Sequence, residues 1–252
     1  MGWLTGDARR SVYAPLDDGA GRVEAVVRRL AGAIALGIIE DGEQLPPESQ
    51  LATFLNVATV TLRDALADLR ARDLVHTRRG RGGGSFVRVD EAALTALARG
   101  RLEQLGSTDL RDLGDLRSAV AGTAARLAAA RASARDVHGL HALLSRLADA
   151  PRASHQRRLE GRYYLAVAAA AQSARLTLQE FQLQAELGQV LWAIPRSPAE
   201  IADAVAAHQT VLAAVQARDA EAARDRTEAH VDLVTHQLID VHIRLTRGTV
   251  AS

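Results

Sequence analysis

The stretch from Leu45 to Leu66, LPPESQLATFLNVATVTLRDAL, constrains the fold of this chain more than any other. Apolar residues recur at helical spacing on both sides of a break that begins at Asn56. Asn tolerates the left-handed backbone of a sharp turn, so the pattern predicts two short helices joined tightly. Pro46 and Pro47 can open the first helix, and Thr59 can cap the second. A helix-turn-helix of this kind places its second helix in the major groove of DNA.

A glycine-rich hairpin is predicted directly after the second helix. The segments DLVHTRR from Asp73 and SFVRV from Ser85 read as short strands, and the GRGGG run from Gly80 has the composition of a turn. Between Arg63 and Arg88 the chain carries seven arginines against three aspartates, a local net charge of +4, while the whole chain carries only +1. The hairpin is therefore interpreted as a basic β-wing that contacts phosphates or the minor groove; an ordinary hairpin is the alternative.

The run from Val23 to Val87 resembles the winged helix of the GntR family of bacterial transcription regulators. The matching residues are Leu45-Pro46-x-Glu48-x-x-Leu51-Ala52, Val57-x-x-x-Thr61-Leu62-Arg63-x-Ala65-Leu66, Leu74-Val75, Arg79-Gly80-x-Gly82 and Phe86-Val87. The resemblance implies DNA contacts from nine residues: Ser49, Thr59, Thr61, Arg63, Arg78, Arg79, Gly80, Arg81 and Gly82.

Two departures from the family pattern fall on the predicted DNA-binding surface. The family usually has Arg at the position of Ser49, and Ser-Arg at the positions of Ala58 and Thr59. Since arginine reads guanine through two hydrogen bonds, this chain is expected to depend more on Thr61, Arg63, the wing arginines and DNA shape. Its operator sequence therefore cannot be copied from the family.

Composition and periodicity predict a mainly α protein: an N-terminal winged helix-turn-helix with a small two-stranded wing, then a C-terminal all-α bundle. Aromatic residues are only 3% of the chain, and helical spacing without strand-like alternation runs from Leu110 onward. The predicted divisions are a flexible arm at 1–21, the winged helix at 22–89, a linker at 90–99 and the helical domain at 100–247. The chain has no cysteine, no apolar signal core at its N-terminus and no apolar run of membrane-spanning length, so a cytoplasmic protein is expected.

The second half, roughly residues 98–245, resembles the FCD ligand-binding domain of the FadR-like branch of the same family. The matching residues are Leu113-x-x-x-Arg117, the segment from Glu160 to Tyr164, His208-x-x-x-Leu212, and Asp219-x-x-x-Ala223 with the helix up to His230. The resemblance implies a small-molecule effector in the bundle. Carboxylic acids are the class that suits the family, although Tyr164 leaves the class open.

Four residues of the bundle are expected to converge. His208 and His230 lie at similar distances from the turn before Asp219, which makes them level in an antiparallel helix pair, and Glu160 and Tyr164 share one helix face. The matching family positions are Asp, His, His and His, which bind a divalent metal. Here Tyr164 supplies a phenol, whose ordinary pKa of about 10 makes it a poor ligand at neutral pH. Two readings stay open: Zn²⁺ or a similar ion at Glu160, His208 and His230, or a metal-free pocket.

The predicted function is a ligand-responsive regulator, by default a repressor, that binds a palindromic double-stranded operator as a homodimer and is not an enzyme. The expected effector-binding residues are Arg117, Glu160, Tyr164, His208 and His230; Arg117 can pair with a carboxylate, or instead form a surface ion pair. One alternative is a metal-free, effector-independent DNA-binding regulator. Another is a metal-dependent enzyme in the bundle, which the lack of a Glu-x-x-His pair at either histidine and of a cysteine nucleophile disfavours.

Overall fold

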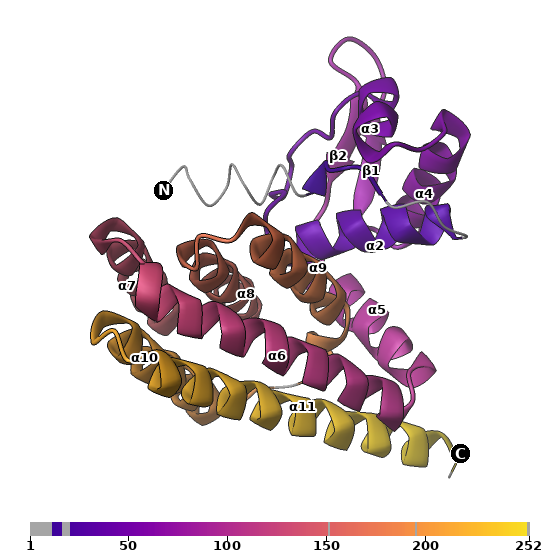
Figure 1. Ribbon diagram of the computed structural model, residues 1–252. Coiled ribbons are helices and arrows are strands. Elements are labelled where there is room, and N and C mark those ends of the chain that lie inside the picture. Colours follow the sequence, from indigo (N-terminus) through magenta and orange to yellow (C-terminus); the bar gives the residue numbers. More distant parts are fainter. Residues whose placement is uncertain (1–11, 17–20, 151, 195, 251–252) are drawn as a thin grey trace.

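The computed structural model describes residues 12–16, 21–150, 152–194 and 196–250, and shows a small N-terminal unit packed on a larger helical bundle (Figure 1). The prediction of a mainly α protein with one two-stranded sheet is confirmed. The predicted arm at 1–21 lies mostly outside the described residues, but Val12 within it is fully buried. In the described part of the chain, no helix is both long and apolar enough to cross a membrane.

The N-terminal unit is built on three helices, α2 (Arg22–Ala35), α3 (Glu48–Leu55) and α4 (Thr59–Ala71). Asn56 has φ 54°, in the left-handed region, so the predicted turn between α3 and α4 is confirmed. The prediction that Thr59 caps α4 is wrong: α4 begins at Thr59, and its N-cap is Ala58, which makes no side-chain capping bond. The helices share a core of buried apolar residues: Val26, Leu30, Ile34, Leu51, Leu55, Leu62, Leu66 and Leu69.

The predicted wing is an antiparallel hairpin of β1 (Val75–Arg78) and β2 (Gly84–Val87). Its register pairs Val75 with Val87 and Arg78 with Gly84, which sends the loop of residues 79–83 away from the core. Gly80 and Gly82 have φ of 97° and 80°, a conformation that side-chain-bearing residues rarely adopt, so the glycine-rich sequence is what allows the tight loop. The result is a winged helix-turn-helix.

The C-terminal bundle contains α5 to α11 and places α6 beside the long α11 along one face of the molecule (Figure 1). The stretch expected to be a short linker at 90–99 is mostly helical, because Asp90 accepts hydrogen bonds from the amides of Ala92 and Ala93 and caps α5. The helices are α5 (Glu91–Gln104), α6 (Ser107–Arg131), α7 (Ala134–Ala148), α8 (Ala153–Ala170), α9 (Ala174–Leu191), α10 (Pro198–Gln216) and α11 (Ala220–Val250).

The two units share a continuous apolar core across the contact between α2 and α9. Gly32 of α2 lies so close to α9 that a Cβ there would stand 2.5 Å from the Cβ of Ala185, which shows how tightly the helices meet. Leu30 and Ile34 of α2 belong to the same cluster as Phe181 of α9. Helix α9 therefore packs directly on α2, the helix that supports the helix-turn-helix.

Candidate functional site

The predicted DNA-binding residues lie on the outer surface of the winged helix. Ser49, Thr59 and Arg63 are exposed, whereas Thr61 is half-buried. The Arg63 side chain is 65% exposed, and its Nε donates a hydrogen bond of 2.8 Å to Oε2 of Glu48. This ion pair spans α3 and α4, so Glu48 orients the guanidinium group on the exposed face of the second helix.

The wing carries a second group of exposed basic residues. Arg78, Arg79 and Arg81 are all exposed, as are Gly80 and Gly82 between and beside them. The Arg78 guanidinium lies over the ring of Phe86, 4.5 Å from its centroid, which fixes the base of the wing. With Arg63 on α4, these residues give the exposed surface of the winged helix its excess of positive charge.

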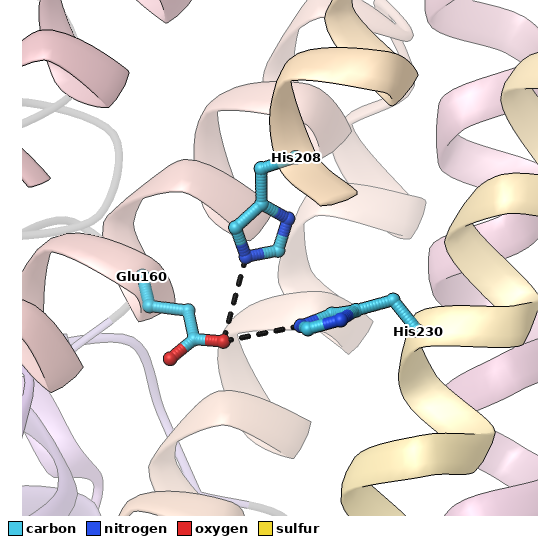
Figure 2. Close-up of side chains that lie close together, drawn as sticks. All are labelled: Glu160, His208 and His230. Carbon is cyan, nitrogen blue, oxygen red and sulfur yellow. Dashed lines mark hydrogen bonds and ion pairs between the residues drawn. The ribbon is translucent and has the colours of Figure 1, made fainter. Parts of the chain in front are cut away.

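Three of the predicted bundle residues converge on one point, each from a different helix (Figure 2). Oε1 of Glu160 on α8 lies 3.4 Å from Nε2 of His208 on α10 and 3.3 Å from Nε2 of His230 on α11. All three residues are buried, and their nearest donor atoms lie within 4.8 Å of one another. They form a group that could hold a metal ion.

Burial and neighbouring charges set the protonation of this group. Burial alone raises the pKa of Glu160, but the charge of Arg196 and hydrogen bonds from the two histidines hold it well below its ordinary value. Burial lowers the pKa of His208 to about 4, against the opposing effect of the Glu160 carboxylate. At neutral pH the site therefore combines an ionised carboxylate with a neutral His208.

Tyr164, the fourth predicted residue, lies against the same cluster. Its ring meets that of His208 edge to face at 5.3 Å, and burial raises the pKa of its phenol far above the ordinary range. The Tyr164 hydroxyl has no hydrogen-bond partner among the described residues. Arg117 of α6 places its guanidinium 4.8 Å from the centre of the Tyr164 ring.

Arg117 is a buried cation, not a surface residue. It is only 2% exposed, and its Nε and Nη1 atoms have no hydrogen-bond partner in the described part of the chain. The alternative reading of Arg117 as a surface ion pair is therefore wrong. A buried guanidinium with free donors is unusual in a folded protein, because buried donors normally have an acceptor.

Sequence reasoning missed several charged residues of this region. Arg196, between α9 and α10, donates from Nη1 to Oε2 of Glu160 at 2.5 Å and from Nη2 to Oε1 at 3.3 Å. Glu180 of α9 is fully buried; burial raises its pKa, and its Oε2 has no hydrogen-bond partner among the described residues. Arg157 of α8 is partly buried and donates to the carbonyl of Ile194. The one-turn spacing of Arg157 and Glu160 was visible in the sequence, whereas the positions of Arg196 and Glu180 depend on tertiary packing.

The type and spacing of the Glu160, His208 and His230 donors suit a tetrahedral ion. Ligands about 2.0–2.1 Å from such an ion lie roughly 3.3–3.4 Å apart, close to the two distances from Oε1. The surrounding charge does not suit one, since Arg196 already forms hydrogen bonds with both Glu160 oxygens and the phenol of Tyr164 is held neutral. The three donor atoms thus suit a divalent metal, whereas the charge of Arg196 beside them opposes one.

Helix α8 also forms part of the contact with the winged helix. Gly161, next to Glu160, packs so closely that a Cβ there would lie 2.5 Å from Cδ2 of Leu36, at the end of α2. Arg162 donates hydrogen bonds to the carbonyls of Leu36, at 3.3 Å, and Gly37. A cavity of about 20 Å³, enough for one water molecule, lies between α8 and the end of α2. It is lined by residues of the cluster and of α2, including Glu160, Arg196, Gln184, Ala35 and Leu36.

Comparisons with known proteins agree with both halves of this architecture. Residues 22–84 match the family described as bacterial regulatory proteins, gntR family, and residues 112–233 match the FCD domain. Over 227 residues the chain is 38% identical to an HTH-type transcriptional regulator, RmpR, of Mycobacterium gastri, covering 89% of this chain and 82% of that protein.

Two further relatives extend the comparison. An L-lactate dehydrogenase operon regulatory protein of Escherichia coli is 30% identical over 240 residues, covering 89% of this chain and 91% of that protein. The solved structure of E. coli McbR/YncC shares the fold, with a TM-score of 0.52, 19% identity and coverage of 90% of this chain and 99% of that one. With its winged helix-turn-helix and FCD domain, the chain belongs to the GntR family of bacterial transcription regulators.

Proposed function

We propose that this regulator binds a palindromic operator as a homodimer and that a small acidic effector in the helical bundle changes its affinity for DNA. The observation that carries the proposal is the position of α8, which contributes Glu160 and Tyr164 to the buried cluster and Arg162 to the contact with α2. Repression is the expected sign of regulation, and the cytoplasm is the expected location. A two-fold dimer would place two winged helices on matching half-sites.

The residues proposed to contact DNA divide by chemistry into base-reading and backbone-binding groups. On α3 and α4, Ser49, Thr59, Thr61 and Arg63 are the residues proposed to reach base edges, with Arg63 held by Glu48. In the wing, the proposed contacts to phosphates or the minor groove come from Arg78, Arg79, Gly80, Arg81 and Gly82.

The proposed effector site consists of the buried polar side chains of the bundle. Arg117 offers two guanidinium nitrogens without partners, and Tyr164 offers a hydroxyl without a partner, so the two together suit a carboxylate. Glu160, His208 and His230 complete the lining. The name of the E. coli relative refers to an L-lactate dehydrogenase operon, and lactate is itself a small carboxylic acid.

The way in which an effector would act on DNA binding follows from the size of the cavity. Of the proposed effector-binding residues only Glu160 lines this cavity, and about 20 Å³ is too small for any organic acid, so uptake beside the cluster requires the walls to move. Part of the wall is Ala35 and Leu36, which end the helix that supports the helix-turn-helix. An effector that binds one arrangement of the walls better than the other would shift the position of the winged helix.

Two earlier alternatives are less well supported. In an enzyme, the histidines would be available to a substrate, but here both Nε2 atoms face the Glu160 carboxylate. An effector-independent DNA-binding protein has no need for a buried arginine with free donors. Binding of Zn²⁺ at Glu160, His208 and His230 stays an untested prediction, and no step of the proposed function depends on it.

Selection from random duplex DNA tests the proposal. The full-length protein is expected to enrich an inverted repeat, and its affinity for that repeat should fall steeply with rising salt, because bound arginines displace counterions from phosphates. Failure to enrich any sequence, or enrichment of a single half-site without symmetry, would contradict the proposed dimeric binding mode.

A further inference from the structure

The Glu160 carboxylate is already neutralised by a cation that belongs to the protein. The Arg196 side chain is only 8% exposed, and it reaches both carboxylate oxygens, at 2.5 Å and 3.3 Å. Oε1, the oxygen that faces His208 and His230, is one of the two. The Arg196 guanidinium therefore donates a hydrogen bond to the same Glu160 oxygen, Oε1, that lies beside both histidines.

The charge around this carboxylate is positive before any ligand is added. Arg117, Arg157 and Arg196 interact electrostatically with the cluster, and the buried groups that oppose them are Glu160 and Glu180; Glu200, which also acts on Arg196, is exposed to solvent. Three arginines against the two buried carboxylates leave a net charge of +1 even when both are ionised, and a divalent ion would raise it to +3. Charges in a buried site are poorly screened, so such an excess opposes metal binding.

The protonation of two nearby groups is set mainly by burial. Burial, together with the charge of Arg196, lowers the pKa of Arg157 to about 10. Tyr164, which stands where the family pattern has a histidine, keeps its proton because burial raises its pKa. The position that would supply a third imidazole thus holds a neutral phenol.

We propose that the Arg196 guanidinium takes the place of a metal ion at Glu160, and that the site binds a carboxylate through arginine side chains instead of through a metal. The buried cluster has surplus positive charge, and Arg117 has free donors in it, which is the complement of an anion. Arginine binds a carboxylate with two parallel hydrogen bonds and needs no metal. This inference rests on the effector site proposed above.

Zinc binding measured by calorimetry, elemental analysis and thermal melts tests the role of Arg196. The wild-type protein is expected to hold no stoichiometric zinc after dialysis and to show no change of melting temperature with Zn²⁺. Arg196→Gln removes the competing cation, and its affinity for Zn²⁺ should rise at least about tenfold, with a matching rise in melting temperature. Adding His208→Ala to Arg196→Gln should abolish that gain, which would locate the ion at this cluster.

Two further variants separate Arg196 from its neighbours and guard against a misfolded Arg196→Gln. Arg196→Lys keeps the positive charge and should remain without zinc. Tyr164→His restores the missing imidazole but leaves Arg196 in place, so it should change zinc affinity less than Arg196→Gln. One equivalent of zinc in the wild type that is lost in His208→Ala, or full zinc binding in Tyr164→His alone, would overturn the inference. DNA binding by the same proteins is measured separately and bears on the proposed function alone.

Discussion

Glu160 and Arg162 are two residues apart on α8 and face different domains. The Glu160 carboxylate lies in the buried cluster with His208 and His230, whereas the Arg162 guanidinium donates hydrogen bonds to the carbonyls of Leu36 and Gly37 at the end of α2. A helix moves as a unit over so short a distance, so a displacement of α8 at Glu160 is also a displacement at α2. This pair of contacts is the physical basis of the coupling proposed between effector binding and DNA binding.

Removing the Arg162 contact should loosen the end of α2. Arg162→Ala deletes two hydrogen bonds to backbone carbonyls, a change of about 1–2 kcal/mol, or roughly five- to thirtyfold in the opening equilibrium. Hydrogen exchange should accelerate at the amides of Ile38 and Ile39, which both bond to the carbonyl of Ala33. Arg111→Ala, at an exposed position of α6, is the control and should leave these amides unchanged. Equal exchange in both variants would show that α8 does not hold α2.

The wing arginines should contribute to affinity without specifying sequence. Arg79→Ala should weaken binding to operator and unrelated DNA by similar factors and reduce the slope of log affinity against log salt by about 1. Fluorescence anisotropy over a series of salt concentrations measures this slope. Arg175→Ala, at an exposed position of α9, removes the same charge from the other domain and should leave the slope unchanged. A loss confined to one operator sequence would instead make Arg79 a base-reading residue.

Alanine substitutions at two helical glycines should change the free energy of unfolding in opposite directions. A Cβ at Gly114 would lie 2.4 Å from Cγ2 of Thr235, so Gly114→Ala forces α6 and α11 apart and should lower the free energy of unfolding by about 1–3 kcal/mol. Nothing lies within 4 Å of the corresponding position at Gly100 in α5, so Gly100→Ala should raise it by about 0.5–1 kcal/mol. Urea denaturation measures both. A Gly114→Ala variant that is more stable than the wild type would show that α6 and α11 can move apart without loss of stability.

Stability should fall as the pH drops from 7 to 5, partly through His208. Burial lowers the pKa of His208 from the ordinary 6.5 to about 4, so in this range the unfolded chain binds a proton that the folded protein does not. The free energy of unfolding then decreases with falling pH, by about 3 kcal/mol at most once pH 4 is reached. Urea titrations at pH 7, 6 and 5 in the presence of a chelator measure the change. His208→Gln should show a shallower dependence, and an unchanged dependence would assign the effect to other groups.

The N-terminal half could be predicted from sequence because its information is local. The left-handed turn at Asn56, the apolar spacing of α3 and α4, and the glycines of the wing each act over a few residues. The error at Thr59 was also local: a threonine at the start of a helix can stand at the N-cap or one position later, and Ala58 took the cap. Asp90, in contrast, caps α5 through its side chain, so a helix begins where the sequence predicts a linker.

The candidate site was only partly predictable, since it joins residues from distant helices. The resemblance to the FCD domain picked out Glu160, His208 and His230, which do converge. Arg196 could not be found in this way, because it lies outside any helical period and its meeting with Glu160 is fixed by the path of the chain between α9 and α10. The burial of Arg117 was equally invisible, since arginine on a helix is usually exposed.

The most direct test of the account is the effect of small carboxylic acids on DNA affinity, measured with the operator obtained by selection. At least one acid is expected to raise the melting temperature of the wild-type protein and to change its DNA affinity. Arg117→Gln should lose both effects, whereas Arg162→Ala should keep the thermal shift and lose the change in DNA affinity. An acid that binds at Arg117 and leaves DNA affinity unchanged would contradict the account, because the bundle would then bind a ligand without control over the winged helix.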